Sequence, residues 1–307
     1  MRTPASMTGT AGPVRRRSGY GRSVYGLEVH GLDDVVVLGE PTDPTEADLL
    51  PVQVSTSPTD APPLEPMGAE RWTRALACGR VLHLDRRAGR ATFHGAALSP
   101  DLLAHPYLGP VAVGFNRWAG REAFHAAAFA EQGHAWIVVG ARTAGKSTLT
   151  AALAAAQLDI LADDIVITDG THAFAGPRSI DLRERLPAEV AAHWPSGHRP
   201  ATPARSQTRW RVGLPPVAPR WPLGGWIFLR WGQELSMIPM QVSITMGRVA
   251  RWRSLPALES DPATILALGA LPAWELTRPK RWAELPETVE LLRHTVRKAA
   301  PTMATVG

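Results

Sequence analysis

An apolar run, a glycine-rich turn and an alanine-rich segment follow one another near the middle of the chain. Residues 135–139 are apolar without interruption, which is typical of a short buried strand. Residues 148–156 contain mainly strong helix formers and predict a helix. The turn between them, residues 140–147, reads GARTAGKS. A strand, a tight loop and a helix in this order are the setting that a phosphate-binding loop requires.

The turn matches the GxxxxGK[ST] pattern of nucleotide-binding P-loops. Glycines let successive backbone N–H groups face an anion at the positive end of the following helix. Lys146 is expected to reach the β- and γ-phosphates and Ser147 to ligate Mg²⁺. We therefore expect ATP and Mg²⁺ as cofactors, with GTP as the alternative nucleotide. The expected nucleotide-binding residues are Gly140, Arg142, Thr143, Ala144, Gly145, Lys146, Ser147 and Thr148.

Two adjacent acidic residues, Asp163 and Asp164, lie between apolar stretches that follow the predicted helix. Two free carboxylates cannot occupy the interior of a buried strand, because isolated buried charge is too costly. They fit the end of a strand beside the loop, where one would hold Mg²⁺ and the other would accept a proton. Only one helix separates them from Lys146, so the acidic strand is expected to be the next strand in the chain.

Taken together, these features resemble the HPr kinase/phosphorylase family and related HPr-kinase-like proteins, some of which occur in gene clusters for ribosomal peptide natural products. The similarity rests on residues 124–128 with His125, on the GxxxxGKS loop, and on residues 161–164 with the acidic pair. It is specific over residues 124–182 and weaker up to residue 298. The resemblance implies an α/β fold with a P-loop mixed β-sheet, the fold that this family shares with phosphoenolpyruvate carboxykinase.

The resemblance also implies a role for each matched residue. Asp163 would take the proton from a substrate hydroxyl as it attacks the γ-phosphate, and His125 would tune the acidic pair. The expected catalytic residues are thus Asp163, His125 and Lys146, and the expected metal ligands are Ser147 and Asp164. The implied activity is an ATP-dependent kinase, a phosphotransferase that phosphorylates a Ser-type hydroxyl on a protein or precursor peptide.

Two departures from the family pattern favour an alternative function. Arg142 and Thr143 stand in the loop where these kinases have a small Ser-Gly-type pair, and Gly176 or Pro177 stands where true HPr kinases carry a Glu. The alternative is a catalytically weak, nucleotide-binding recognition or scaffold protein for a ribosomal peptide pathway. A third alternative is a kinase that acts on a small molecule.

Flanking patterns divide the 307 residues into three parts. Residues 1–23 carry three consecutive arginines without a following apolar region, so we expect a disordered basic tail rather than a secretory signal. Residues 24–105 show short apolar runs at 24–29, 35–38 and 52–54 and a hairpin pattern at 80–94, and predict a smaller β-rich N-terminal part. Residues 106–300 would form the kinase-like domain. A helix expected at 102–118, broken at its prolines, crosses into this domain. Within it we expect a helix within 179–190, strands at 226–230 and 236–246, and helices at 262–271 and 286–299.

The composition indicates which classes of partner and which cellular compartment to expect. A net charge of +5 favours an acidic partner such as a nucleotide or an acidic peptide, and no nucleic-acid-binding motif is present. The single cysteine, Cys78, fits a reducing cytoplasm, and no apolar run is long enough to span a membrane. Residues 194–222, rich in Trp, Pro and Arg, are expected to form an irregular lid or covering loop. Self-association into a homo-oligomer stays open.

Overall fold

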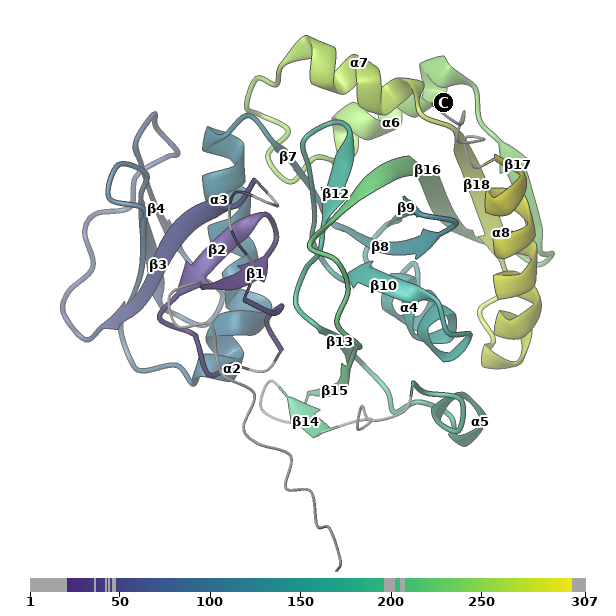
Figure 1. Ribbon diagram of the computed structural model, residues 1–307, viewed down its shortest axis with the longest axis horizontal. Helices are drawn as coiled ribbons and strands as arrows, with labels where there is room; N and C mark the ends of the chain where they lie inside the picture. Colours follow the sequence, from purple (N-terminus) through teal and green to yellow (C-terminus); the bar gives the residue numbers. More distant parts are fainter. Residues whose placement is uncertain are drawn as a thin grey trace, which may run out of the picture.

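The computed structural model describes residues 21–35, 37–41, 43, 45, 48–195, 202–204 and 208–299. Over these residues the chain is a mixed α/β protein, as expected, with two large sheets and one small sheet (Figure 1). The predicted basic tail lies outside the described residues up to residue 20. Its last two residues, Arg22 and Ser23, belong to the first strand.

The N-terminal strands form a mixed sheet of six described strands in the order β1-β2-β3-β6-β5-β4. The strands are β1 (Arg22–Val24), β2 (Leu27–His30), β3 (Leu50–Ser57), β4 (Arg71–Ala75), β5 (Val81–Asp85) and β6 (Arg90–His94). The predicted hairpin is confirmed, because β5 pairs with β6 in antiparallel register. The strand predicted at 35–38 is wrong. Val35 and Leu38 are joined there by a turn, in which the Leu38 amide donates to the Val35 carbonyl at 3.2 Å.

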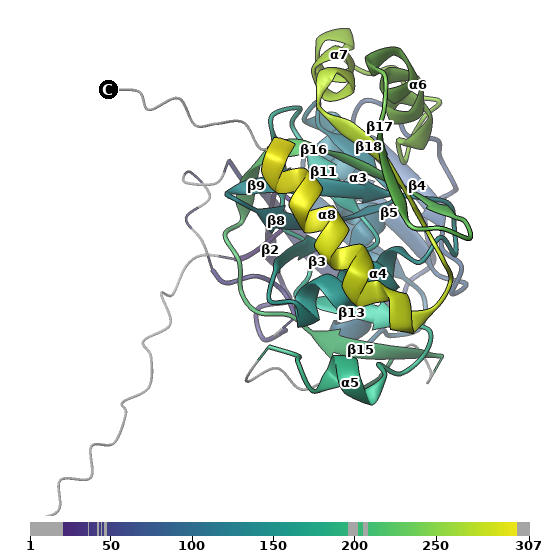
Figure 2. The same ribbon diagram turned by 90° about the vertical axis from the view of Figure 1, so that its right-hand side faces the viewer.

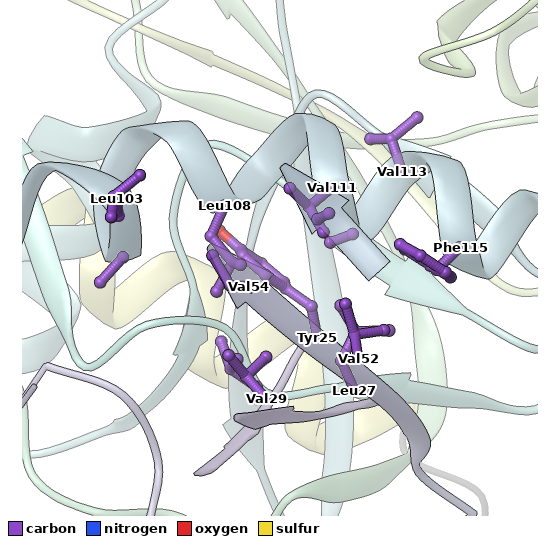
Figure 3. Packing of buried hydrophobic residues seen from close by; sticks show 14 of the residues in the cluster. Tyr25, Leu27, Val29, Val52, Val54, Leu103, Leu108, Val111, Val113 and Phe115 are labelled. Atoms are coloured by element: carbon purple, nitrogen blue, oxygen red, sulfur yellow. The ribbon is translucent and has the colours of Figure 1, made fainter. Parts of the chain in front are cut away.

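A helical segment joins this sheet to the rest of the molecule. It comprises α2 (Pro100–Leu102), the π-helical turn η1 (Leu103–Tyr107) and α3 (Leu108–Trp118). It is interrupted near Pro106 as predicted, whereas Pro110 lies within the first turn of α3, where a missing amide hydrogen is tolerated. In Figure 3, Leu108, Val111 and Phe115 of α3 lie close to Val52 and Val54 of the sheet. Each such buried side chain contributes about 1.5–3 kcal/mol.

The predicted boundary at residue 105 falls inside η1, within this apolar cluster. The same cluster includes Ile167 and Phe174 from the second sheet. A continuous core therefore connects the N-terminal strands to the strands that carry the predicted loop.

The second sheet has nine strands within the described residues, and its main path runs β10-β8-β9-β16-β12-β11-β7. They are β7 (Glu122–Phe124), β8 (Ala126–Glu131), β9 (His134–Val139), β10 (Asp159–Ala162), β11 (Val166–Thr168), β12 (His172–Phe174), β16 (Arg220–Trp231), β17 (Ser236–Pro239) and β18 (Ala273–Arg278). Both β9 and β18 run parallel to β16. Their C-terminal ends therefore meet at one edge, where ligands bind in open α/β sheets.

Helices cover both faces of this sheet (Figures 1 and 2). On one face lie α4 (Lys146–Ala155) and α8 (Leu285–Ala299), preceded by the 3₁₀ turn η2 (Trp282–Glu284), and on the other lie α6 (Val242–Trp252) and α7 (Pro262–Ala270). The predicted C-terminal helices are confirmed as α7 and α8. The strand predicted over 236–246 is right only for β17, because the chain turns into α6 after Met240.

A small sheet lies beneath the second one, built from β13 (Ser179–Leu182), β15 (Arg209–Gly213) and β14 (Thr202–Ala204). The short helix predicted within 179–190 is confirmed at the end of that range as α5 (Ala188–Ala191), whereas the range begins with β13. The segment 194–222 is also more regular than expected. It contains β14, β15 and the beginning of β16. β15 pairs with β13 and β14, and the beginning of β16 pairs with β12, which are pairings that periodicity alone does not reveal.

Candidate functional site

The loop between β9 and α4 is held in a tight turn by its backbone. Gly145 precedes the helix with φ 80° and Thr143 has φ 72°. A non-glycine residue in the left-handed region is uncommon and stores strain, which proteins retain mainly at functional sites. The first amides of a helix have no partner within it and carry partial positive charge. The loop thus directs the N-terminus of α4 toward the edge of the sheet.

Lys146 is the first residue of α4 and is buried, with 8% of its surface exposed. Its Nζ donates a hydrogen bond of 2.8 Å to the carbonyl oxygen of Gly140 and so spans the loop. Burial lowers the pKa of Lys146, while Asp163 and Asp164 act in the opposite direction. The amino group is therefore held at the base of the loop, beside the acidic pair.

Asp163 follows the end of β10 and is 4% exposed. Its Oδ1 accepts a hydrogen bond of 3.1 Å from the hydroxyl of Ser147. Burial, and next the charge of Asp164, raise the pKa of Asp163 to about 7, against the smaller opposing effects of Ser147 and Lys146. The acidic strand is indeed the next strand after the helix, as its spacing predicted.

Asp164 faces His125 rather than Ser147. The His125 Nδ1 lies 2.8 Å from the Asp164 carbonyl oxygen and 3.4 Å from its Oδ1. Asp164 adopts φ 78°, a second strained backbone position in the site. His125 lies between β7 and β8, one hairpin before the strand that enters the loop. Antiparallel pairing of Ala126 with Val139 still places it beside the loop.

These residues line one cleft of about 950 Å³. Of the predicted residues, Gly140 and Ala144 lie in the loop but not on the cleft surface. The predicted residues that line it are His125, Arg142, Thr143, Gly145, Lys146, Ser147, Thr148, Asp163 and Asp164. The structure adds residues that sequence reasoning missed: His105, Asp181, Leu182, Arg183, Glu184, Arg209, Trp231, Arg278, Lys280, Arg281 and Trp282. Two signals were available for part of this set: the basic run at residues 278–281, and the segment 194–222, which contains Arg209.

Gly176, one of the two positions at which the family pattern would place a Glu, is closely packed. A side chain at Gly176 would collide with the ring of Tyr25, and the Gly176 amide donates to the Leu161 carbonyl at 2.8 Å. Asp181 enters the cleft from β13 instead. Both of its carboxylate oxygens accept hydrogen bonds from Arg211, at 2.8 and 3.1 Å, so its charge is already compensated.

The oxygen atoms around Ser147 suit Mg²⁺, which prefers hard oxygen ligands. Across the described ranges, no group of three or more His, Cys, Asp or Glu side chains is placed to hold a metal ion by itself. Mg²⁺ commonly binds through one or two carboxylates together with substrate phosphates. The hydroxyl of Ser147 and the carboxylates of Asp163 and Asp164 therefore fit an ion that arrives with a nucleotide.

Comparison with known proteins gives distant likenesses among solved structures only. No protein-family model and no curated protein matches the chain. Among solved structures, the chain is similar to the Hpr(Ser) kinase/phosphatase from Coxiella burnetii, with 12% sequence identity and a TM-score of 0.29. The match covers 58% of this chain and 98% of that one. It is a distant likeness of fold, and nothing about activity, ligands or partners follows from it. None of the helices in the described residues has the length and apolar character needed to cross a bilayer.

Proposed function

We propose that this chain binds ATP with Mg²⁺ through the loop between β9 and α4 and transfers the γ-phosphoryl group to a hydroxyl. The proposed acceptor is a Ser-type hydroxyl on a protein or precursor peptide. The proposed fold is accordingly a P-loop mixed β-sheet of the HPr kinase and phosphoenolpyruvate carboxykinase type.

One observation carries this proposal: a buried lysine, a helix N-terminus and two carboxylates converge on one cleft. Lys146 and the α4 amides supply positive charge for phosphates, and the Ser147 hydroxyl contacts Asp163 at 3.1 Å. Phosphoryl transfer depends mainly on positioning and charge neutralisation, with one base for the attacking hydroxyl. The cleft supplies each of these requirements from described residues.

The proposed step forms a bond between the acceptor oxygen and the γ-phosphorus and breaks the bond from that phosphorus to the β,γ-bridging oxygen of ATP. The products are the phosphorylated acceptor and ADP. The hydroxyl proton passes to the Asp163 carboxylate, and Lys146 compensates charge on the phosphates. Bound Mg²⁺, held by Ser147 and Asp164, would neutralise phosphate charge. His125, through its contact with Asp164, would position that carboxylate.

The Ser147–Asp163 contact also favours the opposite assignment of the two aspartates as metal ligand and proton acceptor in the same reaction. Asp163 would then share the metal ion with Ser147, and Asp164, which is 42% exposed and lies beside His125, would accept the proton. Substitution of each aspartate separates the two assignments, as described in the Discussion.

A second function, that of a nucleotide-binding recognition or scaffold protein with little turnover, is favoured by the closed position at Gly176. Neither Gly176 nor Pro177 supplies a carboxylate, and Asp181 is compensated by Arg211. In this alternative the chain would bind ATP and present a peptide to other proteins without transferring phosphate.

Incubation with γ-labelled ATP, Mg²⁺ and a pooled library of serine-containing peptides tests these alternatives. Labelled phosphopeptide, absent with the Lys146→Ala variant, supports the kinase. ATP binding without labelled product or ADP release supports the scaffold function, and label on a small molecule from a metabolite pool supports the third alternative. Failure of the wild-type protein to bind ATP or GTP would overturn the proposal.

A further inference from the structure

Arg278 is a buried arginine on the floor of the cleft. It ends β18, only 2% of its surface is exposed, and its guanidinium lies over the ring of Trp231 at 4.3 Å. Its Nη2 donates to the Gly145 carbonyl oxygen at 3.1 Å, in the middle of the predicted phosphate-binding loop. Trp231 holds the same loop, because its Nε1 donates to the Thr143 carbonyl oxygen at 3.1 Å.

The charge of Arg278 has no counter-charge in the described protein. It forms no ion pair with any described carboxylate, and its buried Nε has no hydrogen-bond partner. Burial lowers the pKa of Arg278 to about 10, and no neighbouring acid opposes that effect. A buried cation without a partner is costly, and buried charges in native proteins are normally paired. Of the other buried arginines in the described residues, Arg121 is paired with Asp48. Arg178 has no ion pair with a described carboxylate but donates hydrogen bonds to three carbonyl oxygens, whereas Arg278 donates to one.

The parallel strands explain how Arg278 reaches the loop from 133 residues away. Trp231 and Arg278 are register partners at the ends of β16 and β18, and β9 runs parallel to β16 on its other side. All three strands end at the edge where the loop begins. Arg278 therefore approaches Gly145 from the side of β18, whereas Lys146 spans the loop toward Gly140.

We infer that Arg278 is a phosphate-binding residue, and that the polyphosphate of the nucleotide supplies the counter-charge that its guanidinium lacks in the protein. This inference rests on the proposed function and extends it. Arginine suits the role because its planar fork can bond a phosphate while one nitrogen stays on the Gly145 carbonyl. Arg278 would then act with Lys146 as a pair of cations that hold the polyphosphate from two sides of the loop.

The test uses the full chain and the Arg278→Met variant, with two readouts. The first is the affinity for Mg-ATP and for inorganic triphosphate, measured by calorimetry. The second is the melting temperature without ligand. We expect the affinity for both ligands to fall about 10- to 100-fold, the loss that removal of a charge-assisted hydrogen bond causes. We expect the melting temperature of the ligand-free variant to equal or exceed that of the wild type, because an uncompensated charge has been removed.

If the role of Arg278 is only structural, the affinity and melting-temperature measurements should give different results. If it only braced the loop, Arg278→Met would lower the ligand-free melting temperature, and that result would overturn the inference. Unchanged affinity would also overturn it. Arg278→Lys keeps the charge and should retain more affinity for inorganic triphosphate than Arg278→Met does. Equal losses in the two variants would contradict a charge-based role.

Arg248→Met is the matched control. Arg248 also stacks over an aromatic ring, that of Phe228 at 5.2 Å, but it is paired with Glu275 at 2.7 Å and does not line the cleft. Its replacement should leave the affinity for Mg-ATP unchanged. If wild-type protein binds no nucleotide, the proposed function fails. If it binds through Lys146 but Arg278→Met binds equally well, only the inference about Arg278 fails.

Discussion

The hydroxyl of Ser147 donates a hydrogen bond of 3.1 Å to Asp163 Oδ1 and so links the first turn of α4 to the end of β10. Ser147 lies in the first turn of α4, and Asp163 follows β10, the strand that comes after this helix. Their contact means that the acidic pair and the glycine-rich loop belong to one site rather than to two. The expected effects of substitutions in the loop and in the acidic pair are therefore effects on one site.

Lys146→Ala should abolish the thermal stabilisation that ATP confers. The side chain is the buried cation of the loop, and a charged hydrogen bond of this kind contributes about 1.5–3 kcal/mol. Differential scanning fluorimetry with and without Mg-ATP measures the effect. Lys298→Ala is the control, since Lys298 is exposed on α8 and should leave the ATP shift intact. An unchanged ATP shift in Lys146→Ala would exclude this loop as the nucleotide site.

Asp163→Asn should abolish phosphate transfer while sparing nucleotide affinity. The amide keeps the shape and can still accept from Ser147, but it cannot take a proton from the attacking hydroxyl. Asp164→Asn should instead raise the Mg²⁺ concentration that phosphate transfer requires, because one proposed ligand of the ion is lost. Kinetics over a range of Mg²⁺ concentrations compare the two variants. The reverse pattern would assign the proton to Asp164 and the metal ion to Asp163.

Asp163 should also make stability depend on pH in the protein without nucleotide and metal. Its pKa is raised from 3.8 to about 7 by burial and by Asp164, so the folded state binds the proton more tightly than the unfolded state. This stabilising contribution is complete below about pH 4 and is lost as the pH rises through about 7. Asp163→Asn should thus be more stable than wild type at pH 8, by an amount on the order of a few kcal/mol, and similar at pH 4. Urea denaturation of both proteins at each pH measures the difference, and a difference independent of pH would contradict the expectation.

Gly145→Ala should lower both stability and ATP affinity. The residue has φ 80°, and an added Cβ would collide with Arg278 and Trp231, which brace the loop. A strained residue of this kind costs about 1–3 kcal/mol. Gly247→Ala is the control, because Gly247 lies within α6 with open space at its Cβ position. That change should stabilise the protein by about 0.5–1 kcal/mol through helix propensity, and equal effects of the two changes on ATP binding would count against the loop assignment.

The sequence alone determined the local order of strand, loop, helix and acidic strand. Residues 135–168 specify it because the apolar period, the glycines and the helix formers act over neighbouring residues. The same locality explains the successful predictions of the β5–β6 hairpin and of helices α7 and α8. Where pairing partners are distant, pattern reasoning failed, as it did for β13 and β15, whose register joins Asp181 to Arg211.

Only the tertiary structure decided what surrounds the loop. Arg278 and Trp231 reach it because β18 and β9 both run parallel to β16, and no local pattern encodes which strands become neighbours. The tertiary structure also closed the position at Gly176 by packing it against Tyr25 from the N-terminal sheet. Local sequence thus fixes which groups can bind phosphate, whereas the long-range pairing of strands fixes which charges are buried together and left without a partner.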